Sequence, residues 1–394
     1  MREWRKLLIR KIRILFFAPV VLLIHLVSPF LLVRIGAIFG QRVGHLGLDL
    51  ELSLCYERSR ERASRFPKTI DVFYLTGSVS NTYLLGLWRE QIVILPKWLL
   101  DPIHVLNNRL PSYSKYNYFD WVQRSGHQDL SLLDRYPPTL TMPQDDIEKG
   151  KRLLKELGVA PNQPYICLAV RDSAYLAGQE PKLDWSYHDF RDSEIADYLE
   201  MAEYLAELGF IVLRMGKIVK NPLVSRNPNV IDYANSMLQS DFADVFLFST
   251  CTFCISTSTG MDALASIFRV PIGLVNIVNI DSVGKGELVK LFQPKLFIDR
   301  KSGQALTYQE SRVRNLFEIG KTSDFDKKGI TIVENSPKDL CLFAEELVQI
   351  LSLECSVGNI RTTTESITPD QAIKKEGIDK LSKLWLQNHL YYLD

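Results

Sequence analysis

Hydroxyl side chains gather in one short stretch of the chain, where they could bind an anion. The sequence Ser256-Thr-Ser-Thr-Gly260 ends an apolar run that predicts a buried strand, and a helical pattern follows over 261–268. The first N–H groups of a helix have no partners inside it, and the helix dipole favours negative charge there. In an open α/β sheet such a turn lies at the carboxyl ends of the strands, where ligands bind. The stretch therefore predicts either a plain helix cap or a phosphate site, with these candidate ligands: Ser256, Ser258, Thr259 and Gly260.

Two more predicted strands, 165–170 and 210–213, each end in an arginine, Arg171 and Arg214. Both arginines are expected at the same functional edge of the sheet, and the guanidinium fork suits a diphosphate. The alternative for Arg171 is a surface ion pair with Asp172, which the wholly apolar strand before it disfavours. The segments that follow residue 171 add further donor-side candidates: Ser173, Tyr175, His188 and Arg191.

A third group of candidates follows the predicted strand 34–39, where a glycine-rich turn leads into a helical pattern. Gly44 in this turn lets the backbone approach a ligand closely. His45 stands at the start of the helix and is a candidate general base, with a structural cap as the equal alternative. Asp49, one helical turn later, could orient His45 or act in its place. The turn contains neither the P-loop nor the dinucleotide-binding glycine pattern.

The sequence points to no metal ion and no cofactor. Cys251 and Cys254 form the only close cysteine pair, and no second Cys/His pair nearby completes a zinc site. These thiols are expected to be inert core residues in a reducing compartment. The net charge of +1 provides no global field that would attract nucleic acid.

Strands and helices alternate along most of the chain, which predicts α/β architecture with parallel sheets. Besides the strands named above, strands are predicted over 71–75, 92–95 and 270–275, and a helix over 81–89 with Asn81 as its candidate cap. A length of 394 residues suits two domains and an appendage. The stretch from Tyr136 to Pro143 is expected to join an N-terminal domain, 34–140, to a C-terminal domain, 144–352. Residues 353–394 are predicted to form a polar linker and a final helix.

Residues 1–33 are predicted to be a basic and hydrophobic membrane anchor. Sixteen of the twenty residues over 14–33 are apolar, a length that could span a bilayer. Pro19 and Pro29 interrupt this stretch, and the next strand is expected to begin at once. A helix lying in the membrane plane is therefore favoured over a spanning one, on the cytoplasmic face of the inner membrane. The basic flank that would meet anionic lipid comprises Arg2, Arg5, Lys6, Arg10, Lys11 and Arg13, against Glu3 alone.

Blocks of sequence between Arg34 and about Gln349 resemble a family of bacterial glycosyltransferases from surface-polysaccharide gene neighbourhoods. The blocks occur in the family's order: VGHLG, FYLTGSVSN, AVRDSAYL, YHDFRDSEIADY, GFIVLRMG, ISTSTGMDALASIF and VENSPKDL. More distantly, AVRDS and DVFLFSTCTFCISTSTGMDALA are similar to motifs of protein and chitooligosaccharide fucosyltransferases. That motif has a basic pair where this chain has Arg171 and Asp172, which leaves a donor other than GDP-fucose open.

The resemblance implies a GT-B-like fold, in which two Rossmann-like domains face each other across a cleft. It implies that the second domain binds a nucleotide-sugar without a metal ion, with Arg171 at the β-phosphate and Ser258–Gly260 at the phosphates. Together with the predicted anchor, it suggests a glycan or lipid-linked glycan of the cell surface as acceptor. His45 or Asp49 would deprotonate the acceptor if the enzyme inverts, and no such base is required if it retains. Two alternatives stay open: a nucleotide-sugar epimerase of the same fold, and a catalytically inactive membrane-bound scaffold.

Overall fold

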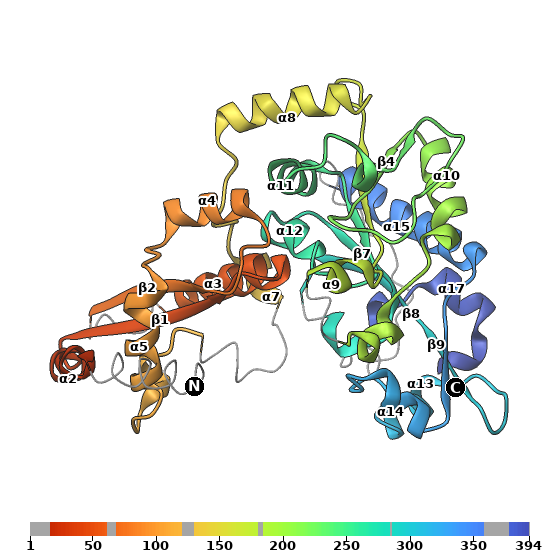
Figure 1. Ribbon diagram of the computed structural model, residues 1–394. Coiled ribbons are helices and arrows are strands. Elements are labelled where there is room, and N and C mark those ends of the chain that lie inside the picture. Colours follow the sequence, from red (N-terminus) through yellow and green to blue (C-terminus); the bar gives the residue numbers. More distant parts are fainter. Residues whose placement is uncertain are drawn as a thin grey trace. The chain divides into compact units, whose positions relative to one another are not determined.

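The computed structural model describes residues 16–60, 68–119, 130–179, 184–283, 286–357 and 378–393 (Figure 1). The chain forms two compact units. Unit 1 comprises residues 1–128 and 135–141, and unit 2 comprises 129–134 and 142–394. The basic flank before residue 14 and much of the predicted linker after residue 357 lie outside the described residues.

Unit 1 is built around a parallel strand pair, β1 (Leu31–Phe39) and β2 (Lys68–Thr76). Helices α3 (Leu50–Arg60), α4 (Thr82–Gln91) and α5 (Lys97–Asn107) accompany the pair. As predicted, Asn81 caps α4, because its side chain accepts a hydrogen bond from the Leu84 N–H at 2.8 Å. The strand expected over 92–95 is present only as a single parallel bridge, between Ile94 and Phe73, with two backbone hydrogen bonds to Phe73. The described sheet of unit 1 is therefore smaller than a full Rossmann sheet.

The predicted anchor runs into the strand pair. Helix α2 (Ala18–Val27) is followed by β1, whose first residue, Leu31, pairs with Lys68 of β2. The boundary predicted after residue 33 is therefore wrong, because residues 31–33 belong to the sheet. Among the described residues, no helix is both long and apolar enough to cross a bilayer.

Unit 2 contains a six-stranded sheet in which each strand is parallel to its neighbours. In spatial order the strands are β5 (Val230–Ile231), β4 (Ile211–Arg214), β3 (Tyr165–Ala169), β6 (Cys254–Ser256), β7 (Ile272–Ile277) and β8 (Val289–Pro294). Numbered along unit 2, this order is 3-2-1-4-5-6, the doubly wound Rossmann arrangement. The apolar runs that predicted β3, β6 and β7 are buried throughout.

Helices cover the sheet of unit 2 because each presents an apolar face to it. Met201 and Leu205 of α10 (Leu199–Glu207) share one core with Phe343 and Leu347 of α15 (Pro337–Val357) and with strand residues such as Val212. Helix α12 (Asp262–Ile267) contacts β6 and β7, α11 (Asp241–Thr250) packs on α12, and α8 (Gln144–Glu156) packs on α11. Helix α9 (Ala174–Gln179) follows β3 in the sequence. A smaller antiparallel pair, β9 (Leu296–Asp299) and β10 (Ile330–Val333), lies with α13 (Tyr308–Val313) and α14 (Thr322–Lys327).

The end of the chain packs into unit 2. The described part forms a 3₁₀ turn, Ile378–Lys380, and a short helix, α17 (Lys383–Asn388), in place of the long final helix that was expected. Trp385 is fully buried, and its indole N–H donates to Asn335 Oδ1 at 2.7 Å. This segment is therefore part of the core of unit 2.

Candidate functional site

The candidate site lies where the strand order of unit 2 reverses. Strands β3 and β6 are neighbours in the sheet but far apart in the sequence, so the chain leaves them in opposite directions. Their carboxyl ends are joined, because the Thr257 N–H donates to Ala169 O at 3.1 Å and the Arg171 N–H donates to Thr257 Oγ1 at 2.8 Å. A doubly wound sheet binds its ligand at such a switch point.

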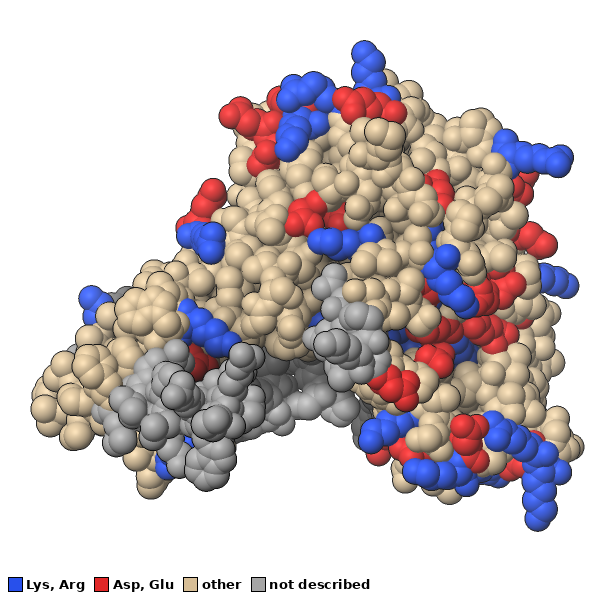
Figure 2. All heavy atoms as spheres, in the orientation of Figure 1, with Lys and Arg blue, Asp and Glu red and all other residues tan. Residues whose placement is uncertain are grey.

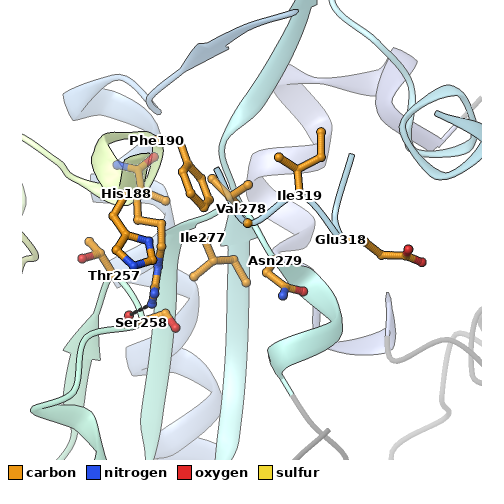
Figure 3. A pocket seen from close by; sticks show the side chains of 12 residues that line it. His188, Phe190, Thr257, Ser258, Ile277, Val278, Asn279, Glu318 and Ile319 are labelled. Carbon is orange, nitrogen blue, oxygen red and sulfur yellow. Dashed lines mark hydrogen bonds between the residues drawn. The ribbon is translucent and has the colours of Figure 1, made fainter. Parts of the chain in front are cut away.

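A pocket of about 260 Å³ opens beside this point (Figure 3). It is lined by the 3₁₀ helix η3 (Ser186–Arg191), the loop after β6, the end of β7 and the segment 318–320. One group of lining residues is polar: His188, Arg191, Thr257, Ser258, Asn276, Asn279 and the acidic Glu318. A second group is apolar: Phe190, Ile277, Val278 and Ile319. The pocket therefore offers both polar partners for an anion and apolar surface for a flat ring.

The loop after β6 is held in one conformation by its own side chains. The buried Ser256 hydroxyl donates to Asp262 Oδ2 at 2.8 Å and accepts from the Thr259 N–H at 3.2 Å. Ser258 has a left-handed backbone with φ of 58°, which is strained for a residue other than glycine. Its carbonyl accepts a hydrogen bond from Arg191 Nη2 at 2.8 Å. Burial raises the pKa of Asp262 to about 6, with Ser256 opposing the shift.

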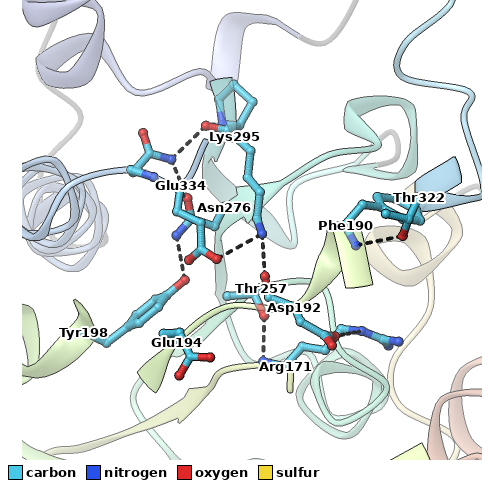
Figure 4. Close-up of polar contacts among 12 residues, drawn as sticks. Arg171, Phe190, Asp192, Glu194, Tyr198, Thr257, Asn276, Lys295, Thr322 and Glu334 are labelled. Carbon is cyan, nitrogen blue, oxygen red and sulfur yellow. Dashed lines mark hydrogen bonds and ion pairs between the residues drawn. The ribbon is translucent and has the colours of Figure 1, made fainter. Parts of the chain in front are cut away.

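An ionic network behind the pocket holds η3 against the strand ends (Figure 4). The Lys295 ammonium, only 3% exposed, donates to the Asp192 carbonyl at 2.5 Å and lies 3.4 Å from Glu334 Oε1. The Asp192 carboxylate accepts from Arg171 Nε at 3.1 Å. Burial lowers the pKa of Lys295 and raises the pKa of Asp192. This network fixes the residue next to Arg191, and so it positions the pocket side of η3.

Asn276 connects the pocket to the core. Its side chain donates to the Tyr198 hydroxyl at 2.8 Å and accepts from both the backbone and the side-chain N–H groups of Asn335, at 2.8 and 2.7 Å. Asn276 also has a positive φ, 54°. A short amide side chain tolerates this backbone, which lets β7 turn at the pocket.

Three of the residues predicted for the donor line the pocket: His188, Arg191 and Ser258. Others are near it but are engaged elsewhere in the structure. Arg171 pairs with Asp192, Ser256 is buried against Asp262, and Thr259 Oγ1 accepts from the Met261 N–H at 3.0 Å. Ser173, Tyr175 and Gly260 are not among the residues that line the pocket.

Arg214 has a structural role, which corrects its prediction as a donor ligand. Its side chain is fully buried and pairs with Asp232 at 3.0 Å, while Nη2 donates to the Asn221 carbonyl at 3.1 Å. Asp172 lies 3.9 Å from the same guanidinium and Arg171 pairs with Asp192, so the disfavoured alternative of an Arg171–Asp172 pair does not form. Arg214 therefore closes the ends of β4 and β5.

The predicted base lies in unit 1. His45 and Asp49 are the ends of a single π-helical turn, His45–Asp49, directly after Gly44. His45 Nδ1 and Asp49 Oδ2 are 2.8 Å apart, so the carboxylate can hold Nδ1–H and leave Nε2 as the acceptor. The imidazole side chain is 45% exposed and packs edge-on against Phe39. This geometry suits a general base, in which a carboxylate orients the imidazole.

Several functional residues were not predicted: Thr257, Asp192, Asp262, Asn276 and Lys295. Lys295 had only a weak signal, since it follows β8, whose apolar pattern is interrupted by Lys290 and Gln293. Asp192 had none, because its partners are 21 and 103 residues away in the sequence. Among the described residues, no group of three or more His, Cys, Asp or Glu side chains is placed to hold a metal ion.

No protein-family model matches this sequence, and no curated protein matches it. Solved structures with a similar arrangement include a glycosyl transferase of family 9 from Veillonella parvula, with a TM-score of 0.42 and 11% identity over 82% of this chain and 97% of that one. The Escherichia coli ADP-heptose lipopolysaccharide heptosyltransferase II has a TM-score of 0.42 and 14% identity over 82% of this chain and 99% of that one. These values are too low to assign this chain the fold or activity of either protein. Neither is a fucosyltransferase, and that more distant resemblance stays a prediction.

Proposed function

We propose that this protein is a glycosyltransferase that uses a nucleotide-diphosphate sugar as donor. The observation that carries the proposal is the pocket at the switch point of a doubly wound sheet, with polar residues of η3 and of the β6–α12 loop around it. A nucleoside diphosphate has an anionic part and a flat ring, which match the polar and apolar lining. The sequence blocks that resemble surface-polysaccharide glycosyltransferases agree with this proposal.

In this proposal, Arg191 and the Ser258 hydroxyl bind the diphosphate. When the bond between the anomeric carbon and the diphosphate breaks, negative charge grows on the leaving oxygen, and a fixed guanidinium stabilises it. The apolar residues Ile277, Val278 and Ile319 provide the surface on which the nucleobase of the donor packs. The roles of Arg171 and of the backbone at Thr259 and Gly260 are indirect, since they shape the loop that presents Ser258.

The acceptor is proposed to be the hydroxyl of a glycan or a lipid-linked glycan in cell-surface polysaccharide synthesis. In an inverting reaction, His45 Nε2 takes the hydroxyl proton, the acceptor oxygen attacks the anomeric carbon, and the diphosphate leaves. Asp49 stabilises the imidazolium that forms. The positive charge that metal-dependent enzymes obtain from a cation would come from Arg191, so activity is expected to persist in a chelator.

The test is transfer of radiolabelled sugar into membrane lipid extract by the purified full-length protein. The donor panel comprises UDP-, GDP-, TDP- and CMP-sugars and ADP-heptose, each with and without EDTA. We expect incorporation from one donor, unaffected by EDTA and lowered by His45→Gln with unchanged donor affinity. Conversion of the donor sugar without an acceptor would instead indicate an epimerase. Donor binding with no transfer to any acceptor would indicate a scaffold.

A further inference from the structure

Helix α2 of unit 1 is apolar on both sides. Its inner side packs Phe17 and Val21 against Leu100 and Ile103 of α5. His25, the only ionisable residue between 16 and 33, contacts Asn107 Oδ1 through Nε2 at 3.0 Å. The outer side, here called the outer face, is exposed and consists of Phe16, Pro19, Val20, Leu22, Leu23, Leu26 and Phe30.

The outer face exposes far more apolar surface than single surface residues do. Leu22, Leu26 and Phe30 are 72%, 75% and 72% exposed. In Figure 2 the visible atoms over α2 have the tan colour of residues other than Lys, Arg, Asp and Glu. A helix that is apolar all round is normally covered, and a contiguous exposed patch marks an interaction site. The outer face therefore requires a partner with apolar surface.

The geometry of α2 requires that this partner is met side-on. Ten helical residues span about 15 Å, half the thickness of a bilayer core. Residues 31–33 cannot lengthen the helix, because they are hydrogen-bonded into β1 beside β2. As far as the structure describes it, the helix is long enough to lie along an apolar surface and too short to cross a bilayer core.

The charges near α2 favour an anionic surface as the partner of the outer face. Six basic residues and one acidic residue occupy the first thirteen positions of the sequence, directly before α2. At the other end of α2, the exposed Lys115 places Nζ 3.4 Å from Ser28 Oγ. A second copy of this chain would bring two such basic segments together, whereas anionic headgroups would neutralise them.

We propose that the outer face docks in the plane of an anionic membrane, with the acyl chains covering Leu22, Leu23 and Leu26. Lys115, at the end of α2, then meets the phosphate layer, and the basic residues that precede α2 in the sequence favour the same anionic surface. This docking does not depend on the proposed transfer reaction, so either proposal can fail alone. If both hold, docking keeps the enzyme where lipid-linked acceptors are concentrated.

The test is flotation of the full-length protein with lipid vesicles. One set contains phosphatidylcholine alone, and the other also contains about 30% phosphatidylglycerol. We expect binding to the anionic vesicles, weakened at about 0.5 M salt. The double variant Leu22→Ser/Leu26→Ser should have a vesicle affinity lower by roughly tenfold or more, because two apolar side chains no longer enter the lipid. The matched control is Val224→Ser/Val313→Ser, two exposed apolar residues of unit 2, and it should bind like wild type.

Three results would overturn the proposal. The first is no binding of folded wild type to anionic vesicles. The second is equal binding by wild type and the α2 double variant, both folded by circular dichroism. The third is a concentration-dependent dimer in the absence of lipid that the α2 double variant dissociates, because a second copy would then cover the outer face.

Discussion

Replacing Arg191 by glutamine should weaken donor binding more than it weakens the fold. Arg191 lies at the end of η3 and lines the pocket, with Nη2 on the Ser258 carbonyl at 2.8 Å. Glutamine keeps a side-chain N–H that can reach a neighbouring carbonyl, but it removes the positive charge. The change therefore targets the electrostatic part of the site.

The expected magnitude follows from the loss of one charged hydrogen-bond donor. A hydrogen bond to a charged group contributes about 1.5–3 kcal/mol, which corresponds to roughly a 10- to 150-fold rise in Kd. The stability change should be smaller, about 1 kcal/mol, because one hydrogen bond to Ser258 O is altered in a half-buried position.

Isothermal titration of the purified protein with its preferred nucleotide-sugar measures this Kd. Arg300→Gln is the matched control, since Arg300 is a half-exposed arginine paired with Asp326 on the surface of unit 2. Arg300→Gln should leave the donor Kd unchanged. A Kd for Arg191→Gln within twofold of wild type, with an intact thermal transition, would refute the assignment of Arg191 to the diphosphate.

Three further predictions follow from the same coordinates. Ser258→Gly should raise the unfolding free energy by about 0.5–1.5 kcal/mol, because glycine adopts the left-handed backbone without strain. Titration should show weaker donor binding by the same variant. An unchanged donor affinity would show that the Ser258 hydroxyl does not bind the donor. Burial raises the pKa of Asp262 from 3.8 in the unfolded chain to about 6 in the folded protein, so the folded state holds this proton more tightly. Protonation of Asp262 therefore stabilises the fold fully below pH 3.8, and this contribution to the free energy of unfolding is lost as the pH rises through 6. Asp262→Asn should therefore be more stable than wild type at pH 8 by roughly 1–3 kcal/mol and similar to it near pH 4 in urea unfolding; an equal difference at both pH values would contradict this. Gly150→Ala should destabilise the protein by about 1–3 kcal/mol, since the added Cβ would lie 2.0 Å from the Phe246 ring. Gly86→Ala, where the added Cβ meets open space, should stabilise the protein by about 0.5–1 kcal/mol. A higher melting temperature for Gly150→Ala than for Gly86→Ala would contradict the packing of α8 against α11.

The sheet of unit 2 could be predicted where its strands are continuous apolar runs. Strands β3, β4, β6 and β7 are of this kind, and the predicted strands overlap all four. Strand β8 was missed because Lys290, Gln293 and Pro294 interrupt its pattern. It is the edge strand of the sheet, paired with β7 on one side and making a single isolated bridge, Phe292 to Leu381, on the other, and such residues are tolerated in an edge strand.

The location of the site could be predicted better than the contacts within it. The turn after β6 and the segment after β3 were selected because strand ends meet at one edge, and Ser258, His188 and Arg191 line the pocket there. The partner of each arginine could not be predicted in the same way. Arg214 meets Asp232 only because β4 pairs with β5, and that register depends on the whole sheet.

In unit 1 the local spacing was sufficient. His45 and Asp49 are four residues apart, so any helical turn brings their side chains together, and they are 2.8 Å apart. The strand expected at 92–95 is reduced to one bridge for a non-local reason. Val93 O and the Leu95 N–H both bond to Phe73 of β2, and Pro96 then ends the extended stretch. Contacts between side chains one helical turn apart can thus be predicted from the sequence, whereas the pairing of a strand in a sheet depends on residues distant in the sequence.

Hydrogen–deuterium exchange with and without the preferred nucleotide-sugar tests the central claim most directly. If the donor binds at the switch point of unit 2, protection should increase in the loop after β6, in η3 and in the segment 318–320, which line one pocket. The turn His45–Asp49 should not be protected by the donor alone. Protection confined to unit 1, or to parts of unit 2 outside this pocket, would contradict the proposed donor site.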